Sequence, residues 1–190
     1  ATVIDALLFG IDKVTSTGYS DAEIEMLTSK VDLSKKIILV TGHRRENHGE
    51  GLMNICTALK NVAEAYPNTQ IIYPVHLDPN VKGPVHELLA GVANILLVPP
   101  LAYPAFIWLM EKSYLIITDS GGIQEEAPSL GKPVLVTRTT TERPEAVAEG
   151  TVLLVGTDIE EITSKTKQLL DDETYYASMS ELHNPYGDGK

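Results

Sequence analysis

Two short runs of this sequence combine groups that bind phosphate with groups that carry protons, and the first is Gly42-His43-Arg44-Arg45-Glu46-Asn47. His43 is the side chain there that titrates near neutral pH, and Gly42 would let a ligand approach the backbone closely. Arginines pair well with phosphate oxygens. The run therefore predicts an anion site with a proton-carrying group, and its alternative interpretation is a solvated basic loop.

The second run, Thr118-Asp119-Ser120-Gly121-Gly122-Ile123-Gln124-Glu125-Glu126, places a hydroxyl and two glycines before a predicted helix. Backbone N–H groups and the positive end of a helix receive phosphate in such a turn, so Ser120, Gly121 and Gly122 are candidates to hold a diphosphate. Glu126 lies one helical turn beyond Gly122, where a carboxylate can accept both hydroxyls of a ribose. The predicted ligand is a nucleoside diphosphate. The alternative is a helix cap at Ser120 followed by a solvated acidic turn.

Two other segments are expected near the same place. Residues 138–145 include Arg143, which would offset the charge of an anionic ligand. Residues 74–80 include His76, which taken alone is more typical of a structural histidine than of a ligand-binding one.

These residues follow the apolar runs that would position them. Each run is nearly continuous in apolar residues, as in strands buried on both faces: 36–41, 70–73, 94–98, 114–118, 133–136 and 152–155. Helical periodicity is found at 2–13, 21–29, 52–63, 80–90, 103–112, 123–130 and 158–170. Alternating strands and helices predict an α/β fold: a Rossmann-like, doubly wound parallel sheet of about six strands in a three-layer αβα sandwich. In such folds ligands bind at the carboxyl ends of the strands.

Composition limits the class of protein. The chain has 190 residues, 43% of them apolar, which suits one globular domain with additional segments. The formal net charge of −11 argues against nucleic acid or an anionic membrane surface as a partner. Residues 1–5 show neither the basic start nor the cleavage site of a signal peptide, and the one cysteine, Cys56, suits a reducing compartment, so we expect a cytoplasmic protein.

Several other chemistries are not indicated. The apolar stretch 95–110 contains Pro99, Pro100 and Pro104, which suits a strand, a loop and a helix better than a membrane span. His43 and His48 do not have the spacing of a helical zinc motif, so no metal is expected. The glycine pattern is neither that of a dinucleotide site nor that of a P-loop, so no cofactor is expected.

The motifs together resemble a known family. They are Gly42–Asn47, Pro74-Val75-His76, Thr118–Glu126, Gly131-Lys132-Pro133-Val134-Leu135, Thr141-Glu142-Arg143-Pro144-Glu145 and His183-Asn184-Pro185-Tyr186-Gly187-Asp188-Gly189. In this order they closely resemble the C-terminal half of the bacterial non-hydrolysing UDP-N-acetylglucosamine 2-epimerases. The resemblance implies that residues 1–30 are linker helices from an N-terminal domain, and that residues 31–190 are a Rossmann-like UDP-binding domain. It also implies a homodimer at full length.

The resemblance further implies a reaction and roles. Family members interconvert UDP-N-acetylglucosamine and UDP-N-acetylmannosamine by eliminating UDP and adding it back. The product is used for surface polysaccharide synthesis. The positions that match UDP contacts are His43, Phe106, Ser120, Gly121, Gly122, Glu126 and Arg143. Of these, His43 would also be catalytic, and Arg44 and His76 match an allosteric site. Leu101 stands where some relatives carry a polar residue.

The acidic residues that would act at C2 belong to the other domain in the family, so this chain alone is expected to be inactive. Two alternative functions remain at this point. One is the donor-binding half of a UDP-sugar glycosyltransferase, and the other is a stand-alone module that binds nucleotide sugars.

Overall fold

A parallel sheet forms the centre of the fold. The computed structural model describes residues 2–42, 49–140 and 150–180, together with 144 and 147. Within them the strands are β1 (Lys36–Val40), β2 (Thr69–Pro74), β3 (Ile95–Val98), β4 (Leu115–Thr118), β5 (Val134–Val136) and β6 (Val152–Leu154). All neighbouring strands pair in parallel, in the order β3-β2-β1-β4-β5-β6. This order confirms the doubly wound Rossmann-like fold.

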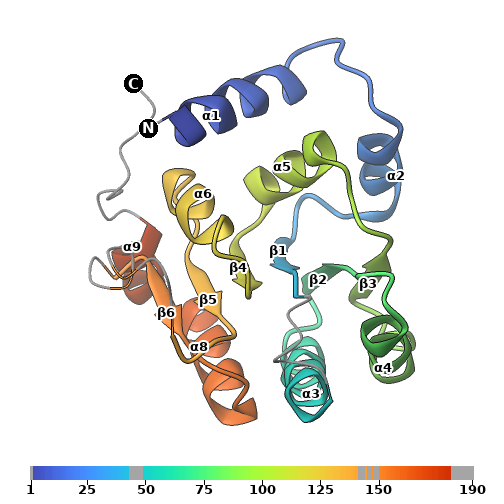
Figure 1. Ribbon diagram of the computed structural model, residues 1–190, viewed down its shortest axis with the longest axis vertical. Helices are drawn as coiled ribbons and strands as arrows, with labels where there is room; N and C mark the ends of the chain where they lie inside the picture. The colour runs from blue at the N-terminus through green and yellow to red at the C-terminus, as the bar shows by residue number, and fades with distance from the viewer. Residues whose placement is uncertain (1, 43–48, 141–143, 145–146, 148–149, 181–190) are drawn as a thin grey trace.

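Helices cover both faces of the sheet, as Figure 1 shows. On one side lie α1 (Thr2–Val14), α2 (Ala22–Lys30), α5 (Tyr103–Lys112) and α6 (Ile123–Ser129). On the other side lie α3 (Glu50–Ala65), α4 (Pro79–Leu89), α8 (Ile159–Asp171) and α9 (Glu173–Ser180). The strands therefore have apolar side chains on both faces, which is why their sequences are continuously rather than alternately apolar.

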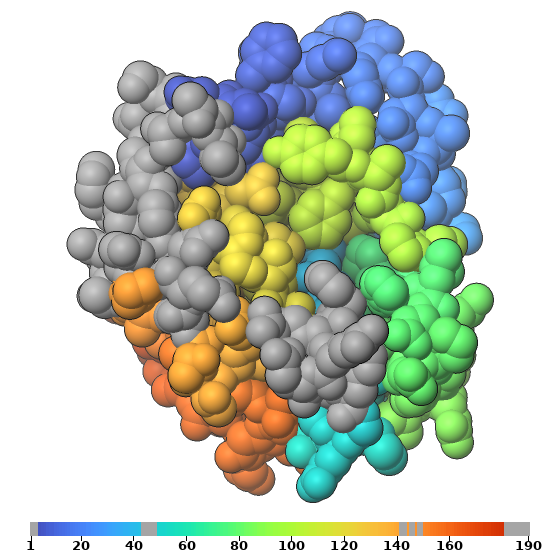
Figure 2. Space-filling view, viewed as in Figure 1, coloured from blue at the N-terminus to red at the C-terminus, as the bar shows by residue number. Residues whose placement is uncertain are grey.

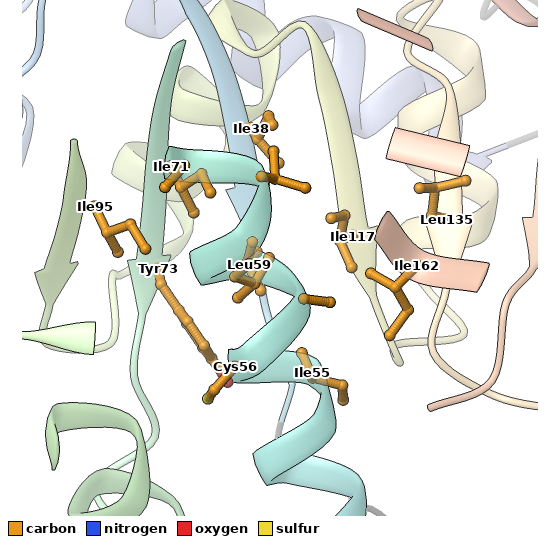
Figure 3. Packing of buried hydrophobic residues seen from close by; sticks show 14 of the residues in the cluster. Ile38, Ile55, Cys56, Leu59, Ile71, Tyr73, Ile95, Ile117, Leu135 and Ile162 are labelled. Atoms are coloured by element: carbon orange, nitrogen blue, oxygen red, sulfur yellow. The ribbon is translucent and has the colours of Figure 1, made fainter. Parts of the chain in front are cut away.

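Successive residues of each strand enter opposite cores. In β1, Ile38 packs with α3 and α4, whereas Ile37 and Leu39 pack with α1, α2 and α5. Figure 3 shows the first of these cores, where Leu59 of α3 faces the sheet and the Tyr73 ring extends toward Cys56. Cys56 is fully buried, as its place in the apolar stripe of α3 predicts.

The two helices that precede β1 pack onto the sheet. Leu7 of α1 and Leu27 of α2 belong to the same buried cluster as Leu39. A Cβ atom on Gly10 would lie 2.8 Å from Ile107 Cδ1, so the glycine permits a close approach of α1 to α5. Asp21 caps α2, accepting hydrogen bonds from the Glu23 and Ile24 N–H groups. The interpretation of residues 1–30 as a linker between domains stays a prediction.

Helical periodicity did not predict α9. α9 carries no long apolar stripe, and tertiary contacts hold it instead. The Tyr176 ring stacks on the Tyr114 ring with centroids 3.9 Å apart, and the Tyr176 hydroxyl donates to the Tyr114 carbonyl over 2.7 Å.

The apolar stretch 95–110 divides into β3, a turn and the greater part of α5. Across the described part of the chain, no helix has the length and apolarity needed to span a bilayer.

Candidate functional site

The order of the strands creates a crevice beside β1. The chain runs outward from β1 through β2 to β3, then returns to the other side of β1 to form β4, β5 and β6. Helices on the two sides of this reversal cover opposite faces, so the loops that leave β1 and β4 diverge at their carboxyl ends. Ligands of doubly wound folds bind at this point.

A pocket of about 210 Å³ occupies that position. Its walls come from the segments that follow β1, β2, β3 and β4: Thr41, Gly42, Pro74, His76, Pro100, Leu101, Phe106, Ser120 and Ile123. The pocket thus brings together Phe106, Ser120 and His76, which lie in three different segments of the sequence. It also places the apolar Leu101 beside Phe106 in the lining, which suits a flat, largely apolar ligand face such as a nucleobase.

Two hydrogen bonds involve the Thr118 hydroxyl at the carboxyl end of β4, and one of them reaches Thr41 after β1. The Thr41 and Thr118 hydroxyl oxygens are 2.7 Å apart, and the Ser120 N–H donates to Thr118 Oγ1 over 3.0 Å. Asp119, the residue directly after β4, is 1% exposed. A Cβ atom on Gly42 would lie 3.6 Å from Asp119 Oδ2, so the backbone passes close to this buried carboxylate.

The turn before α6 leaves its backbone accessible. Gly122 is the N-cap residue, with φ −64° and ψ −39°, and no side chain in the described residues caps the helix there. Ser120 therefore does not cap α6, so the cap at Ser120 in the alternative interpretation is wrong. The phosphate-binding interpretation of this turn stays a prediction. A Cβ atom on Gly122 would lie 3.9 Å from Ser120 Oγ and 3.8 Å from Glu126 Oε1. The hydroxyl and the carboxylate thus lie on either side of the space above Gly122.

Glu126 is half-buried on the first turn of α6. Burial raises the pKa of its carboxyl, the neighbouring Glu125 raises it further, and a hydrogen bond from Tyr103 lowers it. The Tyr103 hydroxyl donates to Glu126 Oε2 over 3.1 Å. This carboxylate is therefore partly desolvated and held in one orientation, which makes it a strong acceptor for ligand hydroxyls.

His76 has a defined orientation although it is exposed. Its Nδ1 atom accepts a hydrogen bond from the Asp78 N–H over 3.1 Å. The neutral ring therefore carries its proton on Nε2. This histidine lines the same pocket as Ser120.

The remaining predicted site residues are Gly121, His43, Arg44 and Arg143. Gly121 lies between Ser120 and Gly122 in the turn. His43, Arg44 and Arg143 lie outside the described residues, so their roles stay predictions.

Tyr103 is the contact that sequence reasoning missed. A tyrosine at the first position of a helix is unremarkable in the sequence, and its partner is 23 residues away. The available signal was its place in the connection from β3 to α5, which leaves the carboxyl edge of the sheet.

Over the described ranges, no three histidine, cysteine, aspartate or glutamate side chains cluster as metal ligands would.

The fold and the pocket define a Rossmann-type α/β domain whose ligand crevice lies at the reversal of strand order. The family described as UDP-N-acetylglucosamine 2-epimerase matches residues 1–190, and the chain belongs to this family. The epimerase of Yersinia pestis is 56% identical over 188 residues, which cover 99% of this chain and 50% of that protein. The chain therefore spans about half the length of the curated relatives it matches.

Solved structures agree in fold and sequence. UDP-N-acetylglucosamine 2-epimerase from Neisseria meningitidis, bound to UDP-N-acetylglucosamine, is 48% identical with a TM-score of 0.91, over 99% of this chain and 50% of that one. MnaA from Staphylococcus aureus, in complex with UDP, is 41% identical with a TM-score of 0.86, over 99% of this chain and 49% of that one.

Proposed function

We propose that this chain is the UDP-binding, C-terminal half of a bacterial non-hydrolysing UDP-N-acetylglucosamine 2-epimerase. The observation that carries the proposal is the open Gly122 between Ser120 Oγ and Glu126 Oε1, at the edge of a pocket in the strand-order crevice. Two structures of the family carry UDP-N-acetylglucosamine or UDP, which supports the choice of nucleotide. The family match favours an epimerase over the donor-binding half of a glycosyltransferase and over a stand-alone module.

In this proposal the nucleotide lies along the carboxyl edge of the sheet. The uracil packs in the pocket beside Phe106, and Glu126 accepts hydrogen bonds from the ribose hydroxyls. The diphosphate meets the backbone at Gly121 and Gly122 and the hydroxyl of Ser120. His76 lines the same pocket, so a second sugar nucleotide bound by Arg44 and His76 would lie next to the first and could regulate it.

The reaction requires the pyrophosphate oxygen to leave C1 of the sugar. A base removes the proton from C2, the C1–O bond breaks, and a C1=C2 double bond forms with release of UDP. Addition of UDP to C1 and of a proton to the opposite face of C2 then yields the epimer. We assign His43 to stabilise the charge that grows on the departing oxygen, with Arg143 beside the diphosphate. The base at C2 belongs to the other half of the protein.

The whole protein is proposed to be a cytoplasmic homodimer that supplies UDP-N-acetylmannosamine for surface polysaccharides. It would need no cofactor. The polypeptide partner of this chain is then an N-terminal domain that closes the other side of the cleft.

The test uses the chain itself and the longer protein. Titration calorimetry should show that the chain binds UDP, and that Glu126→Gln weakens UDP more than it weakens uracil or inorganic phosphate. Equal losses for the three ligands would remove the ribose contact. Incubation with UDP-N-acetylglucosamine alone should give the epimer with the longer protein and none with this chain. Epimerisation by this chain alone would show that the assignment of the base to the other half is wrong.

The two histidines should differ in the longer protein. His43→Ala should lower turnover strongly, because one such donor commonly contributes several kcal/mol to a transition state. His76→Ala should instead change how the rate responds to UDP-N-acetylglucosamine concentration. Near-normal turnover in the first variant, or unchanged activation in the second, would contradict the corresponding role.

A further inference from the structure

Tyr103 connects two helices at the edge of the site. It is the first residue of α5, and its hydroxyl donates to Glu126 Oε2 on α6 over 3.1 Å. Figure 2 shows the surfaces of α5 and α6 side by side on this face of the molecule. The tyrosine residue is 52% exposed, so this hydrogen bond joins the helices at the surface rather than within the core.

The backbone that carries Tyr103 is itself fixed. The preceding Ala102 N–H donates to Glu23 Oε1 on α2 over 3.0 Å, and the Ala102 carbonyl accepts the Phe106 N–H over 3.0 Å. The start of α5 is thereby held from both sides. Tyr103 also remains a donor at neutral pH, because burial of its hydroxyl and the charge of Glu126 raise the pKa of Tyr103 to about 12.

The two oxygens of Glu126 face different neighbours. Oε2 accepts the Tyr103 hydroxyl, whereas Oε1 lies 3.8 Å from the position a Cβ atom would take on Gly122. A carboxylate has about four lone-pair positions. The Tyr103 hydrogen bond takes one of them, which leaves enough acceptor capacity for two ribose hydroxyls on the side of Gly122.

We propose that Tyr103 is a positioning residue for the ribose, orienting the Glu126 carboxylate before the nucleotide binds. The inference rests on the proposed function, in which Glu126 is the ribose acceptor. Without the Tyr103 hydroxyl, nucleotide binding would also have to fix the Glu126 side chain in one conformation, which costs entropy. When the hydrogen bond orients Glu126 before the nucleotide binds, that cost is avoided. From these effects we expect Tyr103→Phe to weaken UDP binding by roughly 5- to 10-fold.

The experiment compares UDP with 2′,3′-dideoxy-UDP, which has no ribose hydroxyls. Calorimetric titrations would use the wild-type chain, Tyr103→Phe, Glu126→Gln and the double variant. The wild type should prefer UDP, and Tyr103→Phe should lose affinity for UDP while keeping its affinity for the dideoxy nucleotide. In the Glu126→Gln background, the tyrosine substitution should have little further effect, because the carboxylate that it orients is gone.

A matched control is available at the opposite end of the sheet. The Tyr66 hydroxyl donates to Asp171 Oδ2 over 2.7 Å, so Tyr66→Phe also removes a tyrosine–carboxylate hydrogen bond. Tyr66 ends α3 and lies at the amino side of β2, remote from the pocket. Tyr66→Phe should leave the affinity for both nucleotides unchanged.

The pH dependence of UDP affinity gives a second readout. It would not change if Tyr103 had a purely structural role. The groups that act on the Glu126 carboxyl are Tyr103 on α5 and Glu125 on α6. Removal of the Tyr103 hydroxyl takes away the hydrogen bond that lowers the pKa of Glu126. UDP affinity should then be lost at a higher pH on acidification in Tyr103→Phe than in the wild type. The dideoxy nucleotide controls for protonation of the diphosphate.

The outcomes separate the two proposals. If Glu126→Gln weakens UDP selectively but Tyr103→Phe does not, the positioning role is wrong and the ribose contact stands. If Tyr103→Phe weakens both nucleotides equally, the tyrosine does not act through the ribose and the inference is wrong. If the wild type binds both nucleotides equally and Glu126→Gln changes neither, the ribose contact itself fails, and the role of Tyr103 fails with it.

Discussion

Two glycine-to-alanine substitutions should separate ligand binding from stability in this domain. Gly122 has a helical backbone with φ −64°, and a Cβ atom there would meet Glu126 Oε1 and Ser120 Oγ at ordinary contact distances of 3.8 and 3.9 Å. Gly131 has φ +74°, and its Cβ atom would lie 3.2 Å from the Ser180 carbonyl oxygen. The same substitution is therefore made at the proposed nucleotide site in one case and at a strained turn in the other.

The magnitudes follow from these geometries. At Gly122, alanine gains about 0.4–1 kcal/mol by restricting the unfolded chain and loses roughly 0.5–1 kcal/mol as a poorer N-cap, so stability hardly changes. The added methyl group would occupy the gap where diphosphate and ribose meet the backbone, and we expect at least a tenfold loss of UDP affinity, about 1.4 kcal/mol. At Gly131, the left-handed backbone costs alanine roughly 1–2 kcal/mol.

The assay is thermal unfolding and UDP titration on the same two variants. Gly131→Ala should melt about 2–8 °C below the wild type and bind UDP normally, since one kcal/mol corresponds to about 2–4 °C for a domain of this size. Gly122→Ala should melt within about 2 °C of the wild type. Normal UDP affinity in a folded Gly122→Ala variant would refute the placement of the diphosphate and ribose at this turn.

Three further predictions concern stability and reactivity. Burial raises the pKa of Glu126 in the folded state. Between the pKa of the unfolded chain and that of the folded protein, the folded protein therefore binds more protons, and its stability falls as the pH rises through this interval. Glu126→Gln should therefore be at least as stable as the wild type at pH 7 in urea unfolding; a clear loss would contradict this. Gly10→Ala should change stability by less than about 1 kcal/mol, because the gain of roughly 0.5–1 kcal/mol for alanine inside α1 offsets the shift that the new methyl group imposes on Ile107 Cδ1. In the Ile107→Val background, which lacks that atom, the same substitution should be more stabilising in a double-mutant cycle; equal effects in both backgrounds would contradict this. Cys56 is buried, which raises the pKa of its thiol to about 12, so it should resist alkylation at pH 8 until the chain is unfolded; rapid labelling of the native protein would be the contrary result.

The fold was predictable because helices cover both faces of the sheet. A continuous apolar run such as residues 37–40 has few other interpretations when helical stripes flank it. α9 was not predictable in the same way. Residues Glu173–Ser180 have no long stripe of their own, and the contacts that hold the helix, such as Tyr176 on Tyr114, join segments 62 residues apart.

The site was predictable only as far as topology allows. Parallel strands bring their carboxyl ends to one edge, so Ser120 and His76 could be expected at the same edge of the sheet without knowledge of the strand order. That β1 pairs with β4, which places Thr41 beside Thr118, is a long-range choice that the sequence pattern leaves open. The same holds for Tyr103 and Glu126, whose pairing depends on how α5 and α6 pack.

The charge distribution indicates how this domain can hold an anion at all. The chain carries a net charge of −11, which repels a diphosphate at long range. Among the described residues that line the pocket, only His76 has a titratable side chain. In the proposed function, the short-range attraction comes from backbone N–H groups at Gly121 and Gly122 and from the Ser120 hydroxyl, together with the proposed contacts of His43 and Arg143. Such contacts act over a few ångströms and are little affected by salt, whereas the repulsion by the whole chain is screened beyond about 10 Å at 0.1 M ionic strength. UDP affinity should therefore depend more on the geometry of the α6 turn than on the net charge of the domain.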